Sequence, residues 1–227
     1  MLKALLPLLL VLAAAATAQE VPVPSAPPAP AAPPAPAAPP LPMVGLATSE
    51  GLITITLESR KAPLTSANFL RYVDQKRLDG TSFYRAMSFP RDPPIGLIQG
   101  GIRNEAKRIL PPIAHESTAR TGLSHDDMAI SMARGAPGSA AGDFFIIIGG
   151  LSGLDAQPPG SGDADGYAVF GHVTGGQDIV RRIMAAPTSP TAGEGAMKGQ
   201  MIAAPIRILT ARRIKPPPAT PPAPAVP

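Results

Sequence analysis

The chain has 227 residues, of which 44% are hydrophobic, 4% aromatic and 31 are proline, and its formal net charge is +4. This length suits one folded domain with tails, and the absence of cysteine excludes disulfides and thiol chemistry. The basic residues are scattered without aromatic residues between them, so we expect solvated surface and no nucleic-acid binding.

The first segment, residues 1–18, has the pattern of a signal peptide. Lys3 supplies a positive charge, Leu5 to Ala16 form an apolar run, and Ala16-Thr17-Ala18 has the small residues of a cleavage site. We expect cleavage after Ala18 and a periplasmic or secreted protein without stable membrane insertion. The alternative is an uncleaved anchor, although the apolar run is shorter than the roughly 20 residues that a membrane span requires.

Two proline-rich segments flank the part of the chain with ordinary composition. Because proline fixes φ and donates no backbone hydrogen bond, we predict a disordered, semi-rigid polyproline-II linker over 19–42. A second, shorter tail of this kind is expected over 216–227. Alternatively, the proline-rich segment 19–42 is a docking ligand for a proline-recognising domain. The folded domain is therefore expected over 43–215.

Five short stretches of this domain have the pattern of β-strands. Apolar and polar residues alternate over 53–57 and 128–133, as in half-buried strands, whereas 144–148 is a continuous apolar run of strand length. Short apolar segments at 168–170 and 206–208 predict two further strands.

Two helices are predicted among the strands. Thr65 or Ser66 can cap the first, and the second spans Gln177–Met184. A sheet of many short strands usually closes on itself, because closure removes its unpaired edges. The fold class is therefore mainly β: a β-barrel whose ends the two helices cover.

Classical catalytic and metal-binding patterns are missing. The three histidines lack the spacing of metal ligands, so we expect neither a metal nor a cofactor. We interpret His115-Glu116 and His125-Asp126 as surface pairs. Asp163 and Asp165 lie in a glycine-rich stretch that we interpret as a flexible loop; the alternative is a calcium loop, although the distal glutamate is missing.

One arginine and one glutamine occupy otherwise apolar strand patterns. Arg85 follows Phe83-Tyr84, and Gln99 follows Leu97-Ile98 just before Gly100-Gly101. A guanidinium in a half-buried strand is costly unless it is paired or used. Arg85 is therefore either a structural cation or a functional one, and this pattern alone favours the structural role.

Several ordered motifs resemble those of the cyclophilin-type peptidyl-prolyl isomerases. The segment 79–85 resembles the signature strand of that family, and 97–101 resembles its (Met/Leu)-Ile-Gln-Gly-Gly strand. The segments 131–134 and 144–146 are similar to the stretch that builds the proline pocket, and 167–171 is similar to the last pocket segment. Tyrosine at the start of that last segment is typical of the exported bacterial members.

The resemblance extends over about Val44 to Ile214 and implies an eight-stranded antiparallel β-barrel capped by two α-helices. It implies a monomeric enzyme without a cofactor, which accelerates rotation about X-Pro bonds of polypeptide clients during protein folding outside the cytoplasm. By resemblance, Arg85 donates a hydrogen bond to the proline nitrogen in the twisted state, and Gln99 orients Arg85. The residues implied to bind substrate are Phe83, Leu97, Met132, Ala133, Arg134, Asp143, Phe145, Leu154 and Tyr167.

The sequence also departs from the family pattern. Gly96 stands where a pocket phenylalanine is usual, and Phe89 in a longer preceding loop is a candidate to fill that gap. Asp143 replaces a glutamine and can either pair with Arg85 or compete with substrate for it. Gly153 replaces an aromatic residue, so we expect a more open pocket. Two alternatives remain, a catalytically weak chaperone or binding module and a structural envelope protein.

Overall fold

The computed structural model of the chain describes residues 38–215. The signal peptide expected over 1–18, the tail over 216–227 and most of the proline-rich linker lie outside the described residues. No helix among residues 38–215 is long and apolar enough to cross a membrane.

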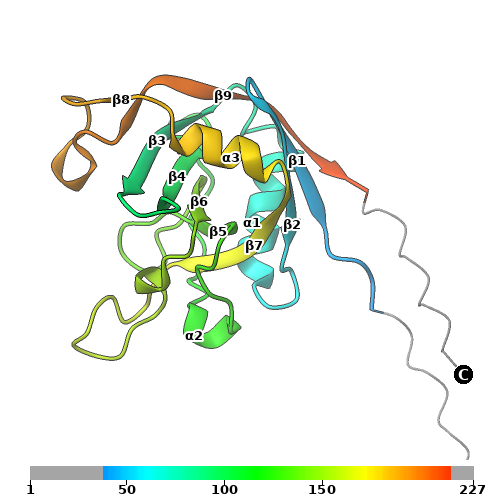
Figure 1. Cartoon of the computed structure of the whole chain (residues 1–227). Coiled ribbons are helices and arrows are strands. Elements are labelled where there is room, and N and C mark those ends of the chain that lie inside the picture. Colours follow the sequence, from blue (N-terminus) through cyan, green and yellow to red (C-terminus); the bar gives the residue numbers. More distant parts are fainter. Residues whose placement is uncertain (1–37, 216–227) are drawn as a thin grey trace, which may run out of the picture. The chain divides into compact units, whose positions relative to one another are not determined.

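Eight antiparallel strands close into a barrel in the order β1-β2-β7-β5-β6-β4-β3-β9, and β9 pairs again with β1 (Figure 1). A ninth, short strand, β8, pairs only with β9 outside this ring. The barrel predicted from the sequence is thereby confirmed. The strands are β1 (Met43–Thr48), β2 (Gly51–Leu57), β3 (Ser82–Phe89), β4 (Ile95–Gly101), β5 (Ala129–Met132), β6 (Asp143–Ile148), β7 (Ala168–Gly175), β8 (Thr188–Ser189) and β9 (Met201–Ile214).

Two helices of the described chain pack against the barrel. Helix α3 contacts β2, β3, β4 and β6, strands from around the ring, so it covers one end of the barrel, and α1 contacts β7 and β9 (Figure 1). The sequence predicts both helices, but not the short α2 or the two 3₁₀ turns. The helical elements are α1 (Pro63–Asp74), α2 (Thr118–Thr121), η1 (Ser152–Leu154), α3 (Gln177–Met184) and η2 (Gly195–Met197).

Helix α1 begins at Pro63, ahead of the predicted caps Thr65 and Ser66. Its first backbone N–H groups are satisfied by a distant carboxylate: Glu116 accepts hydrogen bonds from the backbone nitrogens of Leu64 at 3.2 Å and of Thr65 at 2.7 Å. An anion at this end also suits the helix dipole. Glu116 is buried, so the interpretation of His115-Glu116 as a surface pair is wrong.

The core lies inside the barrel and is built by every second residue of the strands. Because successive side chains of a strand point to opposite faces, Phe144 and Ile146 fill the interior while Phe145 between them points outward. The Phe144 ring packs edge-on against the rings of Phe69 and Phe83, with centroid distances of 5.5 and 5.8 Å. The outward-pointing residues that no other segment covers are therefore the ones available for function.

Candidate active site

The strand register aligns four outward-pointing residues in one row across the barrel. Arg85 on β3 lies opposite Gln99 on β4, and Gln99 lies opposite Phe145 on β6. Phe145 in turn lies opposite Ser131 on β5. Two residues that the sequence places far from Arg85 thus lie in the same row, two and three strands away from it.

Two amide oxygens hold the guanidinium of Arg85. Its Nη1 donates a hydrogen bond to Oε1 of Gln99 at 2.8 Å, and its Nε donates one to Oε1 of Gln200, also at 2.8 Å. Among the described residues, the remaining nitrogen, Nη2, meets only the sulfur of Met87 at 3.8 Å, which is a weak acceptor. Partial burial lowers the pKa of Arg85, but an arginine keeps its proton at neutral pH.

Tyr84 fixes the orientation of Gln99. The amide nitrogen of Gln99 donates to the Tyr84 hydroxyl at 2.9 Å, which leaves the amide oxygen facing Arg85. The hydroxyl itself lies 3.3 Å from Oδ1 of Asp143, to which it donates. Burial and the nearby charge of Asp143 raise the pKa of Tyr84, so its hydroxyl stays protonated and available as a donor.

Asp143 does not form a hydrogen bond or ion pair with Arg85. Its carboxylate accepts hydrogen bonds from the backbone nitrogens of Arg103 at 2.7 Å and Asn104 at 3.4 Å, and from the hydroxyl of Tyr84. Burial raises the pKa of this carboxyl group. Asp143 therefore holds the turn after β4, and the suggestion that it pairs with Arg85 is wrong.

A cleft of about 540 Å³ lies beside this row. Four residues predicted to belong to the site line it, namely Gln99, Ala133, Arg134 and Asp143. The segment between β8 and β9 forms another side of the cleft through Gly193, Glu194 and Met197. No sequence motif pointed to this segment as part of the site.

An apolar wall continues the row on the far side of Gln99 from Arg85. The rings of Phe145 and Tyr167 pack edge-to-face with their centroids 5.4 Å apart, and the backbone of Tyr167 donates to the carbonyl of Leu154 at 2.9 Å. Leu97 precedes Gln99 by two positions on β4, so both side chains share the outer face. The structure therefore brings these predicted pocket residues to the same surface as Arg85.

The side chain of Arg134 supports this wall. Its guanidinium lies over the ring of Tyr167, 4.8 Å from the centroid, and is only 5% exposed. Its Nη2 pairs with Asp163 at 2.6 Å. Asp163 also accepts a hydrogen bond from the backbone nitrogen of Asp165, so its carboxylate is used within its own loop. Among the described residues, no three His, Asp or Glu side chains are arranged to hold a metal ion.

Phe83 and Met132 do not reach the site. Their exposed fractions are 0% and 1%, and both side chains belong to the barrel core. Met132 directly follows the outward-pointing Ser131, so the alternation along β5 turns it inward. Phe83 lies two positions before Arg85, but the β-bulge between them shifts the register and reverses the alternation, so Phe83 points inward. Their assignment as substrate-binding residues is therefore corrected to a packing role.

Phe89 does not fill the gap at Gly96. It lies opposite Ile95 at the end of the β3–β4 hairpin and is 43% exposed, whereas Gly96 lies opposite Ser88. A Cβ atom on Gly96 would lie 2.0 Å from the carbonyl oxygen of Met87, so the hairpin backbone occupies the position a side chain would need. The expectation that Phe89 replaces the pocket phenylalanine missing at Gly96 is therefore wrong.

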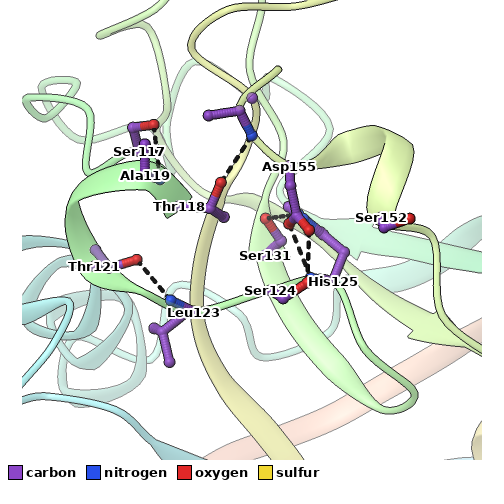
Figure 2. A network of polar contacts seen from close by, with 12 residues as sticks. Ser117, Thr118, Ala119, Thr121, Leu123, Ser124, His125, Ser131, Ser152 and Asp155 are labelled. Atoms are coloured by element: carbon purple, nitrogen blue, oxygen red, sulfur yellow. Dashed lines mark hydrogen bonds and ion pairs between the residues drawn. The ribbon is translucent and has the colours of Figure 1, made fainter. Parts of the chain in front are cut away.

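A second polar network packs against Phe145 of the apolar wall, and Figure 2 shows its side chains. His125 is completely buried; its Nδ1 lies 2.5 Å from Oδ1 of Asp155, and its Nε2 lies 3.0 Å from the hydroxyl of Ser131. Its ring stacks on Phe145 with a centroid distance of 5.9 Å. The interpretation of His125-Asp126 as a surface pair is therefore wrong for the histidine.

This histidine network has the order of groups found in serine hydrolases, in which an acid orients a histidine that contacts a serine. Ser131 is fully buried, however, so its hydroxyl cannot reach a substrate. Burial lowers the pKa of His125, which favours a neutral ring that donates to Asp155 and accepts from Ser131. The network therefore supports the wall from behind.

The fold and the outer row define a cyclophilin-like barrel, and comparisons with known proteins identify the family. The model of the cyclophilin type peptidyl-prolyl cis-trans isomerase family matches residues 43–212. A Streptomyces antibioticus isomerase, cyp18, is 39% identical over 157 residues, covering 66% of this chain and 87% of its own length. An Acinetobacter baylyi isomerase is 36% identical over 151 residues, covering 65% of this chain and 74% of its own.

The fold has a counterpart among solved structures as well. A cyclophilin of Cryptosporidium parvum superposes with a TM-score of 0.60 at 20% identity, covering 78% of this chain and 99% of its own. The chain belongs to the cyclophilin-type peptidyl-prolyl cis–trans isomerase family, and its enzyme class is that of an isomerase of X-Pro bonds.

Proposed function

We propose that this chain accelerates rotation about X-Pro bonds by donating a hydrogen bond from Arg85 to the proline nitrogen. Amide resonance opposes this rotation with a barrier of about 18–20 kcal/mol. In the twisted state the nitrogen is pyramidal and carries a lone pair, and a donor fixed near it stabilises that state more than either planar one. Because no covalent bond breaks, this mechanism requires no nucleophile, acid–base pair or metal.

The observation that carries the proposal is how Arg85 is held. Two of its nitrogens are bound to the amide oxygens of Gln99 and Gln200, each at 2.8 Å, and Nη2 faces only the weak acceptor of Met87 among the described residues. A donor that is oriented before the substrate arrives needs little reorganisation during the reaction. The guanidinium thus has the rigidity and the spare donor that this role demands.

We expect the proline ring to pack against the apolar wall beside Arg85. The side chains that support this placement are Leu97, Phe145, Leu154 and Tyr167. The residues before proline would run along Ala133 and Arg134 into the cleft. A Cβ atom on Gly153 would meet nothing within 4 Å, so the wall is open there, and we expect weak binding of cyclosporin-like ligands.

One solved relative supports the choice of a test substrate. The Cryptosporidium cyclophilin has also been solved in the presence of the dipeptide Ala-Pro, with a TM-score of 0.60 and 19% identity to this chain. We therefore choose a short peptide with an Ala-Pro bond as the test substrate.

The test compares the cis–trans exchange rate of this peptide with the parent enzyme and with Arg85→Ala. Removing one preorganised donor lowers kcat/KM by about 10²–10³-fold. Arg182→Ala is the matched control, because Arg182 lies on the exposed face of α3 and pairs with Asp178. Unchanged activity in Arg85→Ala would refute the proposed role of Arg85.

The same assay separates catalysis from binding alone. A catalytically weak chaperone or binding module would suppress aggregation of an unfolding client equally well with and without Arg85, and the parent would show no exchange above background. An isomerase shows exchange that depends on Arg85.

We further propose that the chain acts as a monomer on proline-containing clients outside the cytoplasm. Residues 1–18 support the location with their charge, apolar run and small-residue cleavage pattern. One relative is named a putative thylakoid lumen isomerase of Synechocystis, 28% identical over 167 residues. Fractionation of cells expressing the full chain tests the location, and an uncut chain confined to the cytoplasm would contradict it.

A further inference from the structure

We propose that Gln200 is a positioning residue that orients Arg85 for catalysis, as a second amide clamp opposite Gln99. This inference rests on the proposed function of Arg85 and adds a residue from the far end of the chain. Gln200 lies 115 residues after Arg85, in the segment that joins η2 to β9, and its Oε1 accepts from Nε of Arg85 at 2.8 Å. No sequence motif pointed to it.

The backbone of Gln200 is tied to β3. Its carbonyl accepts a hydrogen bond from the backbone nitrogen of Ala86 at 2.9 Å, and its neighbour Met201 lies opposite Arg85 in the strand register. Its own nitrogen donates to the carbonyl of Met197 at 3.0 Å. These contacts set the place of Gln200 beside Arg85 independently of the hydrogen bond between the two side chains.

The side-chain amide of Gln200 has a defined orientation. Its Nε2 donates to the carbonyl of Ala196 at 2.9 Å, so its oxygen is the atom that faces Arg85. The reverse orientation would bring an NH₂ group against an N–H donor and an amide oxygen against a carbonyl oxygen. Gln200 is therefore anchored through its nitrogen, as Gln99 is anchored through Tyr84.

The two clamps together restrict the guanidinium plane. A single acceptor lets a planar guanidinium pivot about one hydrogen bond, whereas acceptors on Nε and Nη1 fix both its position and its tilt. The N–H groups of Nη2, which make only the weak contact with Met87 among the described residues, then point in fixed directions within that plane. Rate enhancement depends on such alignment, because a small misplacement of a catalytic group has a large cost.

A purely structural role for Gln200 makes a different prediction. The segment containing Gln200 also contributes Gly193, Glu194 and Met197 to the cleft. If Gln200 only secured that segment, its loss would weaken substrate binding or lower the stability of the fold. If it orients Arg85, its loss lowers kcat and leaves KM nearly unchanged, since the donor acts mainly on the twisted state.

The experiment measures kcat and KM on the Ala-Pro peptide for Gln200→Leu and Gln200→Glu. The leucine variant is similar in size but has no acceptor, and losing one hydrogen bond to a charged group corresponds to about a tenfold fall in kcat. The glutamate variant keeps an oxygen for Arg85 but loses the hydrogen bond to Ala196, and its charge-assisted bond to Arg85 should hold activity within about threefold of the parent. Gln177→Leu is the control, because Gln177 donates to the carbonyl of Val173 on another element.

A double variant and an NMR signal complete the test. In an Arg85→Ala background, Gln200→Leu should cause no further loss, because the two residues act together. The Nε–H resonance of Arg85 should exchange with solvent more quickly in Gln200→Leu than in the parent and in Gln200→Glu. Unchanged kcat or unchanged Nε–H exchange in Gln200→Leu overturns the inference.

The outcomes distinguish this inference from the function on which it rests. Impaired Arg85→Ala together with normal Gln200→Leu refutes the role of Gln200 alone. Normal Arg85→Ala refutes both. If Gln200→Leu is too unstable to assay, the kcat of Gln200→Glu still tests the inference: activity within about threefold of the parent, despite the lost bond to Ala196, supports the acceptor role, and a roughly tenfold loss would count against it.

Discussion

Two polar networks flank the apolar wall, and they differ in whether they leave hydrogen-bond donors unused. The arginine cluster, made of Tyr84, Arg85, Gln99 and Gln200, ends in a guanidinium nitrogen that faces only Met87 among the described residues. The histidine network, made of Ser124, His125, Ser131 and Asp155, closes on itself (Figure 2). Two neighbouring polar networks therefore serve two purposes, depending on whether donors are left over for a substrate.

The comparison indicates that burial determines whether a polar network has a structural or a functional role. Ser131 and His125 are both fully buried, and all their hydrogen bonds are made within the protein. No buried side-chain nitrogen or oxygen atom of the described residues lacks a partner. A saturated buried network stabilises the fold, whereas an oriented group with a spare donor can act on a substrate.

The largest expected effect on stability concerns His125→Ala. The change leaves Asp155 and Ser131 without their shared partner and removes a ring that stacks on Phe145, so the free energy of unfolding should fall by about 2–4 kcal/mol. Urea denaturation at neutral pH measures it.

His172→Ala provides the matched control for this change. His172 lies on β7, is only half-buried and has no side-chain partner among the described hydrogen bonds, so its loss should have a much smaller effect. Equal losses in the two variants would show that the histidine network does not stabilise the barrel.

A smaller effect is expected in the arginine cluster for Tyr84→Phe. The change removes the hydroxyl that anchors the amide of Gln99 at 2.9 Å, so this clamp on Arg85 loosens. Activity on the Ala-Pro peptide should fall about tenfold, while stability changes by less than about 1.5 kcal/mol. If the variant loses stability but keeps its kcat, Tyr84 stabilises the fold and does not orient Arg85 through Gln99.

The sequence predicts those features of the fold and of the site that leave a local pattern in the chain. Alternation along 53–57 and the apolar run 144–148 predict strands of the barrel, because burial of one or both faces leaves a period in the sequence. Arg85 and Gln99 are found because each interrupts an apolar strand and because the motifs around them resemble a family. These signals lie within a few residues of the feature that they predict.

Contacts between distant segments leave no such signal. Glu116 caps a helix 51 residues earlier, Asp155 holds a histidine 30 residues earlier, and Gln200 reaches Arg85 across 115 residues. Phe83 and Met132 show a different limit, since a shift of one position along a strand moves a side chain from the surface to the core. A motif identifies the strand but not the face.

The smallest expected effect is a pH dependence that belongs to the histidine network alone. Burial lowers the pKa of His125 below its ordinary value of 6.5, although the nearby carboxylates of Asp155 and Asp126 oppose the shift. The unfolded chain therefore binds a proton at His125 more readily than the folded one, so stability rises with pH in this range. The contribution is complete above about pH 6.5 and is lost as the pH falls below it.

Urea denaturation at pH 7.5 and 5.5 measures this dependence. Between the two pH values the free energy of unfolding should fall more in the parent than in His125→Asn, which keeps an amide donor for Asp155 but does not titrate. His172→Asn is the control for replacing a histidine by asparagine outside the network. If His125→Asn and the parent lose equal stability, the titration of His125 is not coupled to folding, and the network stabilises the wall through its hydrogen bonds and packing alone.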